Sequence, residues 1–584
     1  MLKLLKRMYA RDWVSFGFIC VLIFISAWMT FTMPGYMATI TTLVETEGSS
    51  MSDIWYNGIM MLLCAVGDVV ATVIAQFLAS KISASLSAKV RGELYSKVVD
   101  FSMEEISNFS TSSLVTRATN DITQVQMVLA MGLTLIVRTP MMVIWAMIKI
   151  VQFGIPQFTW ISIGTIIFMF LLVFSNLVIV VPRFKKIQVY TDKLNSVTRE
   201  NLTGVRVVRA YNAEKYQEEK FQKANSDITG THLFVGKIMA YLFPGNQFAM
   251  NLTSLATYWI GAFIITATGT AAGRISVFSD LVIFMTYAVH LCMSFMMLSM
   301  IFSFLPRSQV AAQRINEVLS MTSKINDGEG KEETEEKGTV EFKNVSFKYP
   351  GAEEYVLKDI TFTAKPGETI AFIGSTGAGK STLINLIPRF YDTTEGEVLV
   401  DGVNVRDYKQ ADLRAKLGYV SQKAVLFKGT IASNVAYGSD EEIDEEQIRK
   451  AMEIAQGADI IEKSDGGIYA GVAQGGSNFS GGQKQRISIA RAIYSKPEIY
   501  IFDDSFSALD YKTDKKLRSV LSKETAGVTS FIVAQRIGTV RDADKIIVID
   551  EGKMVGIGTH EELLADCEVY QQIALSQLSK EELA

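Results

Sequence analysis

Cysteine is scarce in the 584-residue sequence: only Cys20, Cys64, Cys292 and Cys567 occur, and no two of them form a CxxC pair. Thiols so far apart argue against a disulfide framework and against a cysteine metal cluster. An excess of positive charge is also absent, because 57 Lys and Arg residues face 61 Asp and Glu residues and the formal net charge is −4. This balance argues against a nucleic-acid-binding protein.

Charged residues are missing from long parts of the first half of the chain. They are absent from residues 13–44, 150–182, 238–273 and 281–306, while residues 54–80 and 122–148 contain one each, Asp68 and Arg138. Each of these stretches is longer than the ~20 residues with which a helix crosses a bilayer. The pattern excludes a wholly soluble protein and predicts a membrane domain with six spans over residues 13–320.

Basic residues predict the orientation of the spans, because loops rich in Lys and Arg stay in the cytoplasm. The connections 81–117 and 183–237 are rich in basic residues, whereas the connection 45–53 contains acids and no Lys or Arg. Residues 1–12 contain four basic residues among apolar ones and predict an interfacial helix on the inner leaflet. The N-terminus and the chain after the sixth span are therefore expected in the cytoplasm.

Proline is absent from residues 55–100 and 185–211, so the helical pattern continues beyond the membrane. A helix over residues 55–100 would be about 70 Å long, and about half of it would stand in the cytosol. Breaks are expected at residues 102–113 and 212–218. These tips of long helices are well placed to touch a cytosolic domain.

Polar residues inside the spans need their own interpretation. Asp68 and Arg138 are costly in hydrocarbon, so both are expected to face the bundle interior or water, and an ion pair between them is one hypothesis. His290 is more simply a buried, hydrogen-bonded residue than a proton relay. The third and sixth spans are rich in methionine, which suits either a surface for varied apolar ligands or ordinary helix packing.

The composition changes at residues 321–338, a polar segment that is almost free of apolar side chains and predicts a linker. Between residues 339 and 584, strand-like and helix-like runs alternate, as in an α/β domain. There, residues 374–381 read GSTGAGKS and match the phosphate-binding loop G-x-x-x-x-G-K-[ST]. A strand at 369–373 leads into this loop, and a helix at 382–387 is expected to follow it.

Glycines in such a loop let backbone N–H groups surround phosphate oxygens at a helix N-terminus. Lys380 is expected to reach the β- and γ-phosphates, and Ser381 to bind Mg²⁺. A second strand, residues 499–502, ends in Asp503 and places a carboxylate near the same ion. The candidate ATP-binding residues of this region are Gly374, Ser375, Thr376, Gly377, Ala378, Gly379, Lys380, Ser381 and Thr382.

Residues 479–483, FSGGQ, followed by KQR, resemble the signature sequence of ATP-binding cassette (ABC) proteins. Tyr349 is similar to the adenine-stacking aromatic residue of that family, Gln422 to its Q-loop glutamine, and Asp510 to its D-loop aspartate. With the six preceding spans, the chain resembles a bacterial half-size ABC exporter over nearly its whole length. The resemblance implies an α-helical, domain-swapped membrane domain followed by an α/β P-loop domain, with several passes through the cell membrane.

The resemblance also implies ATP and Mg²⁺ as cofactors and a second half as partner. In that family each ATP lies between the Walker A loop of one half and the signature of the other, and the two cytosolic breaks correspond to coupling helices. The Mg²⁺ ligands implied for this chain are Ser381, Gln422 and Asp503. The residues implied to contact the partner's ATP are Ser480, Gly481, Gly482 and Gln483.

Three positions depart from the family pattern. Asp504 stands where the family has the glutamate that polarises the attacking water, Gln535 where it has the switch histidine, and Gln474 where a glutamate precedes the signature. The shorter side chain of aspartate sets its carboxylate back by ~1.5 Å, and a misplacement of 1 Å can cost about 100-fold in rate. Glutamine can hydrogen-bond a phosphate but cannot carry the charge of a protonated imidazole.

Beside an intact signature, these departures predict one half of a heterodimeric multidrug exporter. Its own Walker A loop would belong to a degenerate site, and its signature would complete a competent site on a partner that carries the catalytic glutamate and the switch histidine. A slow homodimer is the alternative. The expected cargo is a hydrophobic or amphipathic small molecule such as a drug or a lipid. A dedicated peptide or siderophore exporter half stays open, whereas the intact loop and signature disfavour a nucleotide-gated protein that does not pump.

Overall fold

The computed structural model describes residues 1–45, 49–330, 337–439 and 442–577. It divides into two compact units. The helical unit comprises residues 1–100 and 109–321, and the α/β unit comprises residues 101–108 and the described residues after 321. Residues 331–336 of the predicted linker and residues 46–48 of the first predicted outer connection lie outside the described residues.

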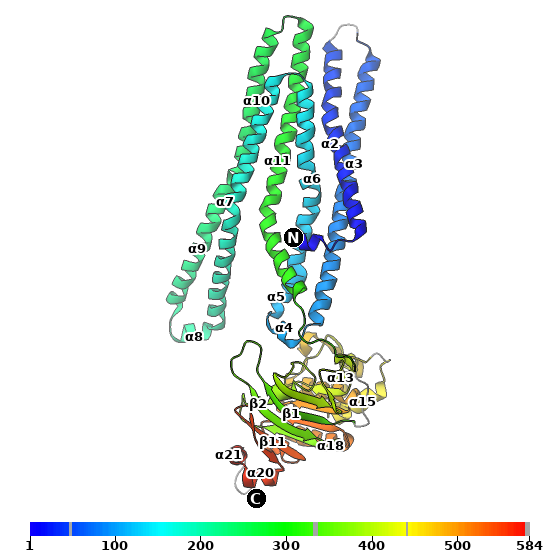
Figure 1. Cartoon of the computed structure of the whole chain (residues 1–584), viewed down its shortest axis with the longest axis vertical. Helices are drawn as coiled ribbons and strands as arrows, with labels where there is room; N and C mark the ends of the chain where they lie inside the picture. Colours follow the sequence, from blue (N-terminus) through cyan, green and yellow to red (C-terminus); the bar gives the residue numbers. More distant parts are fainter. Residues whose placement is uncertain (46–48, 331–336, 440–441, 578–584) are drawn as a thin grey trace. The chain divides into compact units, whose positions relative to one another are not determined.

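Long apolar helices make up the helical unit (Figure 1). Its elements are α1 (Leu2–Leu5), α2 (Ala10–Glu45), α3 (Met51–Val99), α5 (Thr111–Thr116), the π-helical turn η1 (Arg117–Asp121), α6 (Ile122–Gln152), α7 (Pro156–Thr203), α8 (Val205–Ala210), α9 (Glu214–Ala240), α10 (Leu242–Ala267) and α11 (Ala271–Ser320). Six stretches are long and apolar enough to cross a membrane, which confirms the predicted number of spans.

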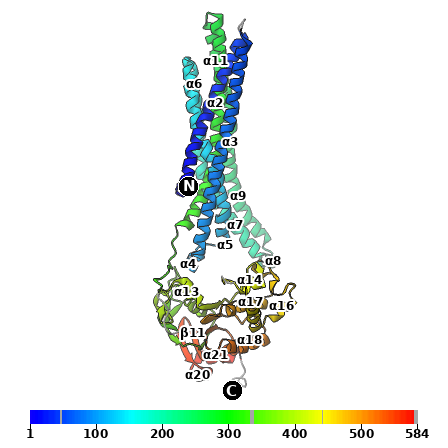
Figure 2. The ribbon, with the colours of Figure 1, turned by 90° about the vertical axis from the view of Figure 1, so that its right-hand side faces the viewer.

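The helices of this unit pack side by side through their apolar faces. In both views α2 lies along α3, and α11 packs against α6 and α10 (Figures 1 and 2). Phe31, Phe158 and Phe284 are fully buried in the core that α2, α6, α7, α10 and α11 share. The rings of Phe158 and Phe284 stack with their centroids 4.7 Å apart. Contacts between side chains from distant parts of the sequence therefore hold the bundle together.

The long helices beyond the apolar spans are confirmed in part. The helix α3 has 49 residues without interruption, and α4 (Met103–Ser107) follows it with a capping box between Ser102 and Glu105, inside the first expected break. The second break is wrong in position, because the chain turns at residues 211–213 and α9 already begins at Glu214. Asn212 has φ 48° there, a left-handed conformation that asparagine tolerates better than most residues.

The N-terminal helix is shorter than predicted. The helix α1 has four residues, and Leu4 is 1% exposed because it packs against Leu86, Ile122 and Ile315 of three other helices. Arg7 forms an ion pair with Glu93 of α3. Burial of the apolar side chains against the bundle thus competes with the flat interfacial helix that residues 1–12 predict.

The hypothesis of an ion pair between Asp68 and Arg138 is wrong for the part of the chain that the structure describes. The Asp68 carboxylate accepts hydrogen bonds from the hydroxyls of Ser26 on α2 and Thr72 on its own helix, the latter at 3.4 Å. Asp68 and Arg138 are both half-buried. Hydroxyl donors close to Asp68 satisfy its charge without a cation, which is a common solution inside apolar bundles.

The described residues of the α/β unit form two larger sheets and one short sheet of two strands. Its strands are β1 (Val340–Phe347), β2 (Leu357–Ala364), β3 (Thr369–Ile373), β4 (Glu395–Val400), β5 (Val403–Asn404), β6 (Leu417–Val420), β7 (Gly429–Thr430), β8 (Gly471–Val472), β9 (Ile499–Asp503), β10 (Thr529–Val533), β11 (Lys545–Asp550) and β12 (Lys553–Gly558). One sheet is antiparallel in the order β2-β1-β4-β5. The other has the order β12-β11-β3-β10-β9-β6, and all its pairs except β11–β12 are parallel.

The α/β unit also contains helices and short turns. Besides α4, they are α12 (Lys380–Ile384), α13 (Gln410–Ala415), α14 (Ile431–Val435), α15 (Glu445–Ile454), α16 (Ala458–Lys463), the 3-10 turns η2 (Gly467–Tyr469) and η3 (Gln474–Gly476), α17 (Gly481–Tyr494), α18 (Tyr511–Glu524), α19 (Ile537–Val540), α20 (His560–Asp566) and α21 (Glu568–Gln577).

The central strands of the parallel sheet are buried on both faces. Every residue of β9 and β10 is buried, and both strands are mainly apolar, with Asp503 at the end of β9 and Thr529 and Ser530 at the start of β10. In a parallel sheet the carboxyl ends of the strands lie at one edge. Residues that follow β3, β6, β9 and β10 therefore come together, and they are the residues that the motifs single out.

Candidate functional site

The phosphate-binding loop starts where the buried strand β3 ends. The strand confirms the prediction for residues 369–373. A Cβ atom on Gly374 would lie 2.0 Å from the carbonyl oxygen of Ile549, and Gly379 has φ +101° as the residue that precedes α12. No residue with a side chain fits the first position without movement of the backbone, and few adopt the conformation of the second. Glycine at both positions lets the loop turn tightly between strand and helix.

The helix after the loop is shorter than predicted. It begins at Lys380 and ends at Ile384, not at Ile387. Pro388 explains the difference, because proline has no N–H group and disfavours helical backbone at the residue before it. The chain then turns through Arg389, which has φ 55°.

Lys380 points its ammonium group into the loop. Its Nζ donates hydrogen bonds to the carbonyl oxygens of Gly374 at 2.9 Å and Ser375 at 2.7 Å, and the residue is 8% exposed. Burial lowers the pKa of Lys380, and the neighbouring carboxylates of Asp504 and Asp503 oppose this effect. Ser375, Thr376 and Gly377 form the exposed crest of the loop. The arrangement places one positive charge inside a loop whose crest is open to a phosphate group.

Ser381 and Asp503 join the loop after β3 to the end of β9, which lies one strand beyond β10 in the sheet. The Ser381 hydroxyl donates to Oδ1 of Asp503 at 2.6 Å. Asp503 ends β9 and is 6% exposed, and burial raises the pKa of its carboxyl group while the Ser381 hydrogen bond opposes that rise. A hydroxyl and a carboxylate beside a phosphate site are the oxygen ligands that Mg²⁺ takes in nucleotide-binding proteins. These two residues fit the ion, which when bound would neutralise charge on the phosphates.

Gln422, the third predicted Mg²⁺ ligand, has a different partner. Its Nε2 donates to Oδ2 of Asp504 at 3.2 Å. Gln535 donates to the same oxygen at 2.9 Å. One carboxylate oxygen thus accepts from Gln422, which follows β6, and from Gln535, which follows β10, so two of the three departures from the family pattern, Asp504 and Gln535, are in direct contact.

The backbone at Asp504 fixes this carboxylate. Asp504 has φ 46° and is 7% exposed, and its N–H donates to the carbonyl oxygen of Val533 at 3.0 Å. A left-handed conformation is uncommon for residues other than glycine, asparagine and aspartate. The side chain has little freedom because both its backbone and its Oδ2 atom are engaged.

Tyr349 lies beside the far end of the loop. Its hydroxyl is 2.9 Å from that of Thr382, and its ring meets the ring of Tyr391 edge to face with centroids 5.3 Å apart. The half-buried ring is therefore held from two sides. Such a fixed aromatic surface suits the stacking role that the sequence predicts for it.

The signature begins the helix α17. Ser480 caps it: its Oγ accepts from the N–H of Gln483 at 3.3 Å, and the Gln483 side chain accepts from the N–H of Ser480 at 2.9 Å. A Cβ atom on Gly481 would meet no heavy atom within 4 Å, so its own chain gives no steric reason for glycine there. Among the described residues, the hydrogen bonds of the Ser480 and Gln483 side chains stay within the motif. An exposed N-terminus of a 14-residue helix is suited to bind an anion from outside the chain.

Two further polar residues support the signature and its surroundings. Asp510 caps α18 by accepting from the N–H of Thr513 at 3.0 Å, and this hydrogen bond lowers the pKa of its carboxyl group. Gln485, which sequence reasoning missed, is 1% exposed and donates to the carbonyl oxygen of Ser421 at 3.2 Å. Gln485 could have been recognised in the sequence as a polar residue on the buried face of α17, four residues before Ile489. It ties the signature helix to the segment that contains Gln422.

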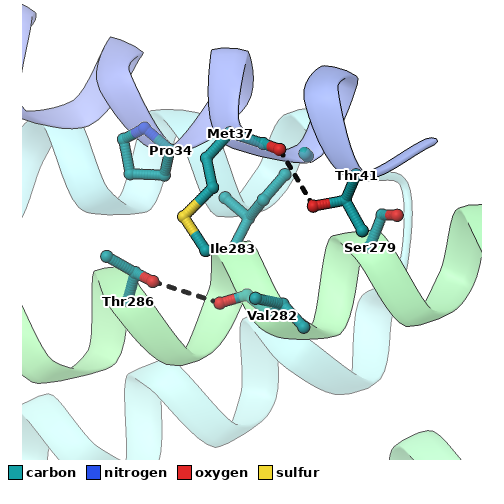
Figure 3. A pocket seen from close by; sticks show the side chains of 8 residues that line it. Pro34, Met37, Thr41, Ser279, Val282, Ile283 and Thr286 are labelled. Carbon is teal, nitrogen blue, oxygen red and sulfur yellow. Dashed lines mark hydrogen bonds between the residues drawn. The ribbon is translucent and has the colours of Figure 1, made fainter. Parts of the chain in front are cut away.

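The helical unit contains a small cavity between α2 and α11 (Figure 3). Its volume is about 50 Å³, and it is lined by Pro34, Met37, Ala38, Thr41, Ser279, Val282, Ile283 and Thr286. The hydroxyls of Thr41 and Thr286 are bound to carbonyl groups of their own helices. Ligand pockets for drug-sized molecules occupy about 300–1,000 Å³, so this cavity is a packing gap. Of the methionines in the predicted sixth span, Met293, Met297 and Met300 are exposed.

Comparisons with known proteins agree with the division of the chain into a helical unit and an α/β unit. The family model described as ABC transporter transmembrane region matches residues 16–305, and the model described as ABC transporter matches residues 357–507. An ABC transporter ATP-binding protein of Mycobacterium tuberculosis is 36% identical over 549 residues, which are 93% of this chain and 93% of that protein. An ATP-dependent lipid A-core flippase of Pseudomonas aeruginosa is 36% identical over 385 residues, which are 65% of this chain and 62% of that protein.

A solved structure has the same fold as this chain. It is a bacterial Atm1-family ABC exporter with ATP bound, with a TM-score of 0.81 and 22% sequence identity over 98% of this chain and 100% of that chain. The similarity covers both the helical unit and the α/β unit. The predicted fold class, a six-span membrane domain followed by an α/β P-loop domain, is confirmed.

The geometry of Ser381 and Asp503 predicts how Mg²⁺ supports nucleotide binding. Asp503→Asn keeps the size of the side chain but removes the charge opposite the ion, so we expect the apparent affinity for Mg²⁺ to fall about tenfold or more. A fluorescent ATP analogue titrated with Mg²⁺ measures this change. Asp550→Asn, at the end of β11 in the same sheet, is the matched control. Equal Mg²⁺ dependence in both variants would contradict the assignment.

Proposed function

The chain belongs to the ABC transporter family as a half-size, ATP-driven exporter, and on this premise we propose that it is the degenerate-site half of a heterodimeric exporter of hydrophobic or amphipathic compounds. In this proposal its own Walker A loop holds ATP at a site with weak hydrolysis. Its signature completes the competent site on the partner. The partner supplies the catalytic glutamate and the switch histidine.

The observation that carries the proposal is the contact of Asp504 with two glutamines. A general base must reach the attacking water in the reactive geometry. The Oδ2 atom of Asp504 instead accepts from Gln422 at 3.2 Å and from Gln535 at 2.9 Å. Both donors would have to leave before this oxygen could accept a proton from water. The short side chain and its two amide partners act in the same direction, toward slow hydrolysis.

The signature supports the second half of the proposal. Gly481 is exposed, and no atom of its own chain lies within 4 Å of the position of its Cβ atom. Glycine at an open position is explained when another molecule approaches the backbone closely. A phosphate group of the partner's ATP at the N-terminus of α17 fits this requirement.

Other functions fit these residues less well. A slow homodimer would carry Asp504 and Gln535 at both sites, and the unequal effects of variants at the two motifs in the second prediction below distinguish it from the heterodimer. A dedicated peptide or siderophore exporter half would use the same ATPase machinery. A nucleotide-gated protein that does not pump would not need both an intact Walker A loop and an intact signature.

The proposed cargo is lipid-like or drug-like. The relatives named ATP-dependent lipid A-core flippase are 34–36% identical over about two thirds of the chain. Exposed methionines at 293, 297 and 300 add flexible, polarisable side chains to the surface of α11. Both observations favour an apolar ligand that contacts the spans directly.

The proposed setting is the cell membrane of a bacterium, with the N-terminus and the ATP-binding domain in the cytoplasm. The tip formed by α8 and the start of α9 would then be cytosolic, and Tyr211 at this tip is 81% exposed. We propose that it docks on the partner's ATP-binding domain. On this chain the corresponding surface would be the exposed pair Phe427 and Tyr437, whose rings stack at 4.5 Å shortly after Gln422.

The first prediction concerns hydrolysis by this chain without a partner. The wild-type chain is expected to bind ATP but to turn it over slowly. Asp504→Glu together with Gln535→His lengthens the carboxylate and removes one amide donor, so Mg²⁺-dependent phosphate release should rise about tenfold or more. Asp504→Glu alone should give less, because both glutamines still hold the carboxylate. Brisk turnover by the wild-type chain would contradict a degenerate site.

The second prediction separates the two nucleotide motifs in the co-expressed pair. Gly481→Asp brings a negative charge to the N-terminus of α17 and should lower the ATPase rate about 100-fold or more. Lys380→Ala weakens ATP binding at the site that hydrolyses little and should reduce the rate less. Gly471→Asp is the control, because Gly471 is also exposed with open space at its Cβ position. If Gly481→Asp barely changes the ATPase rate while Lys380→Ala lowers it strongly, the proposal has assigned the two sites to the wrong chains.

The third prediction concerns coupling. A photo-crosslinking amino acid at position 211 should capture the partner's ATP-binding domain, since the exposed tip offers a large aromatic side chain for docking. The same group at position 160, where Trp160 is 71% exposed near the start of α7, is the control and should not capture it. Mass spectrometry of the crosslinked bands identifies the captured domain. Repeated failure to capture either ATP-binding domain from position 211 would remove the coupling role.

A further inference from the structure

A charged cluster lies where the first tip of the helical unit, residues 109–121 between α3 and α6, meets the end of α11. The π-helical turn η1 contains Arg117 and Asp121, which are only 7% and 4% exposed. Buried charges are costly unless they are paired. Short π-helical turns inside longer helices are uncommon and occur often at functional positions. The cluster takes no part in nucleotide binding, so its charges need another explanation.

Arg117 forms the tight side of the cluster. Its Nη1 donates to the carboxylate of Glu317 at 2.7 Å and to the carbonyl oxygen of Arg314 at 2.8 Å. The guanidinium also lies 4.6 Å from the centre of the Phe109 ring, and its Nε donates to Ser113 at 3.3 Å. Arg117 is therefore held by the first tip on one side and by the last turns of α11 on the other.

Asp121 forms the loose side of the cluster. The shortest distance of its ion pair with Arg314, from Nη1 to Oδ2, is 3.5 Å. The same Oδ2 atom is buried and has no hydrogen-bond partner among the described residues. Burial raises the pKa of Asp121, and the charges of Arg314 and Arg117 oppose this effect. A buried carboxylate oxygen without a donor would gain free energy from a small approach of Arg314.

The chain just after α11 is held by the short helix α4 of the α/β unit. Glu105 of α4 is 3% exposed, and its Oε1 accepts from the N–H of Lys324 at 3.1 Å. The Lys324 ammonium also pairs with Glu104. Within the α/β unit, Glu104 and Glu105 thus bind the chain after the end of α11. Within the helical unit, Arg117 and Asp121 bind α11 before its end at residue 320.

We propose that Arg117, Asp121, Arg314 and Glu317 form a two-position charge clasp that positions the first tip on α11. In the present structure the Arg117–Glu317 pair is closed and the Asp121–Arg314 pair is long. The second pair tightens when the exporter binds ATP. Two discrete arrangements of one charged cluster give the helices α3 and α6, which flank the tip, a defined displacement to follow. These four are positioning residues and do not touch ATP.

The experiment measures a distance that does not depend on the cargo. Spin labels at positions 95 and 211, where Tyr95 and Tyr211 are 71% and 81% exposed, report the separation of the two tips of the helical unit in the co-expressed complex. The native cysteines are replaced by serine. The distance distribution is recorded without nucleotide and with ATP, Mg²⁺ and vanadate. In the parent we expect a second distance population after trapping.

A double-mutant cycle tests the clasp itself. Asp121→Asn and Arg314→Gln are each expected to reduce the trapped population at least about fivefold, and the double variant should be no worse than either single variant. Affinity for a fluorescent ATP analogue should stay within about twofold of the parent, because none of these residues lies at the nucleotide site. Lys193→Gln, which breaks an exposed ion pair with Asp227 on the other tip, is the matched control and should leave the population unchanged.

Three results would overturn the proposal. The first is the parental distance population in Asp121→Asn, and the second is the absence of a nucleotide-dependent population in the parent. The third is additive losses in the double variant, which would mean that the two residues act independently. If Asp121→Asn does not fold, Glu317→Gln replaces it, since Glu317 is 56% exposed at its side chain and tolerates the change. An unchanged population in Glu317→Gln would also reject the clasp.

Discussion

The constraint on which the ATP site depends is the burial of parallel strands on both faces. Side chains of β9 and β10 are buried along their whole length, and each fully buried large apolar side chain contributes about 1.5–3 kcal/mol. The small polar and charged residues of these two strands, Thr529, Ser530 and Asp503, lie at or next to a strand end. Because parallel strands end at one edge, Asp503, Asp504 and Gln535 lie beside the loop after β3. The apolar core therefore determines where the charged chemistry stands.

Polar groups at this edge are half-buried or buried and satisfy one another. Lys380 donates to loop carbonyls, Ser381 to Asp503, and Gln422 with Gln535 to Asp504. The same contacts that remove unsatisfied groups also fix the side chains. At Asp504 two amide donors share one carboxylate oxygen, so this side chain is held by its neighbours as well.

Much of the fold and the site follows from local sequence. The Walker A loop is recognised by its local residue pattern, although the atom that forbids a side chain at Gly374 belongs to the distant Ile549, and the six spans follow from the absence of charge over stretches longer than a bilayer. The errors came from contacts between distant residues. Asp68 found hydroxyls of Ser26 and Thr72, not Arg138, and Leu4 found a pocket between three helices, so α1 stays short. The shared acceptor of Gln422 and Gln535 could not be predicted either, since three separate strands must meet before those amides share one oxygen.

Charges in the helical unit follow one further rule, which connects its structure with its mechanical role. Inside the spans the charge of Asp68 is met by hydroxyl groups, whereas buried charges at the first tip, Arg117 and Asp121, are met by ionic partners on α11. Breaking a buried ion pair by removal of one partner is strongly destabilising, while a hydroxyl partner is a weaker and more local restraint. Ionic contacts thus hold the segment that is broken into short helices and the last turns of the 49-residue helix α3, where Glu93 pairs with Arg7, whereas the middle of α3 around Asp68 has hydroxyl partners.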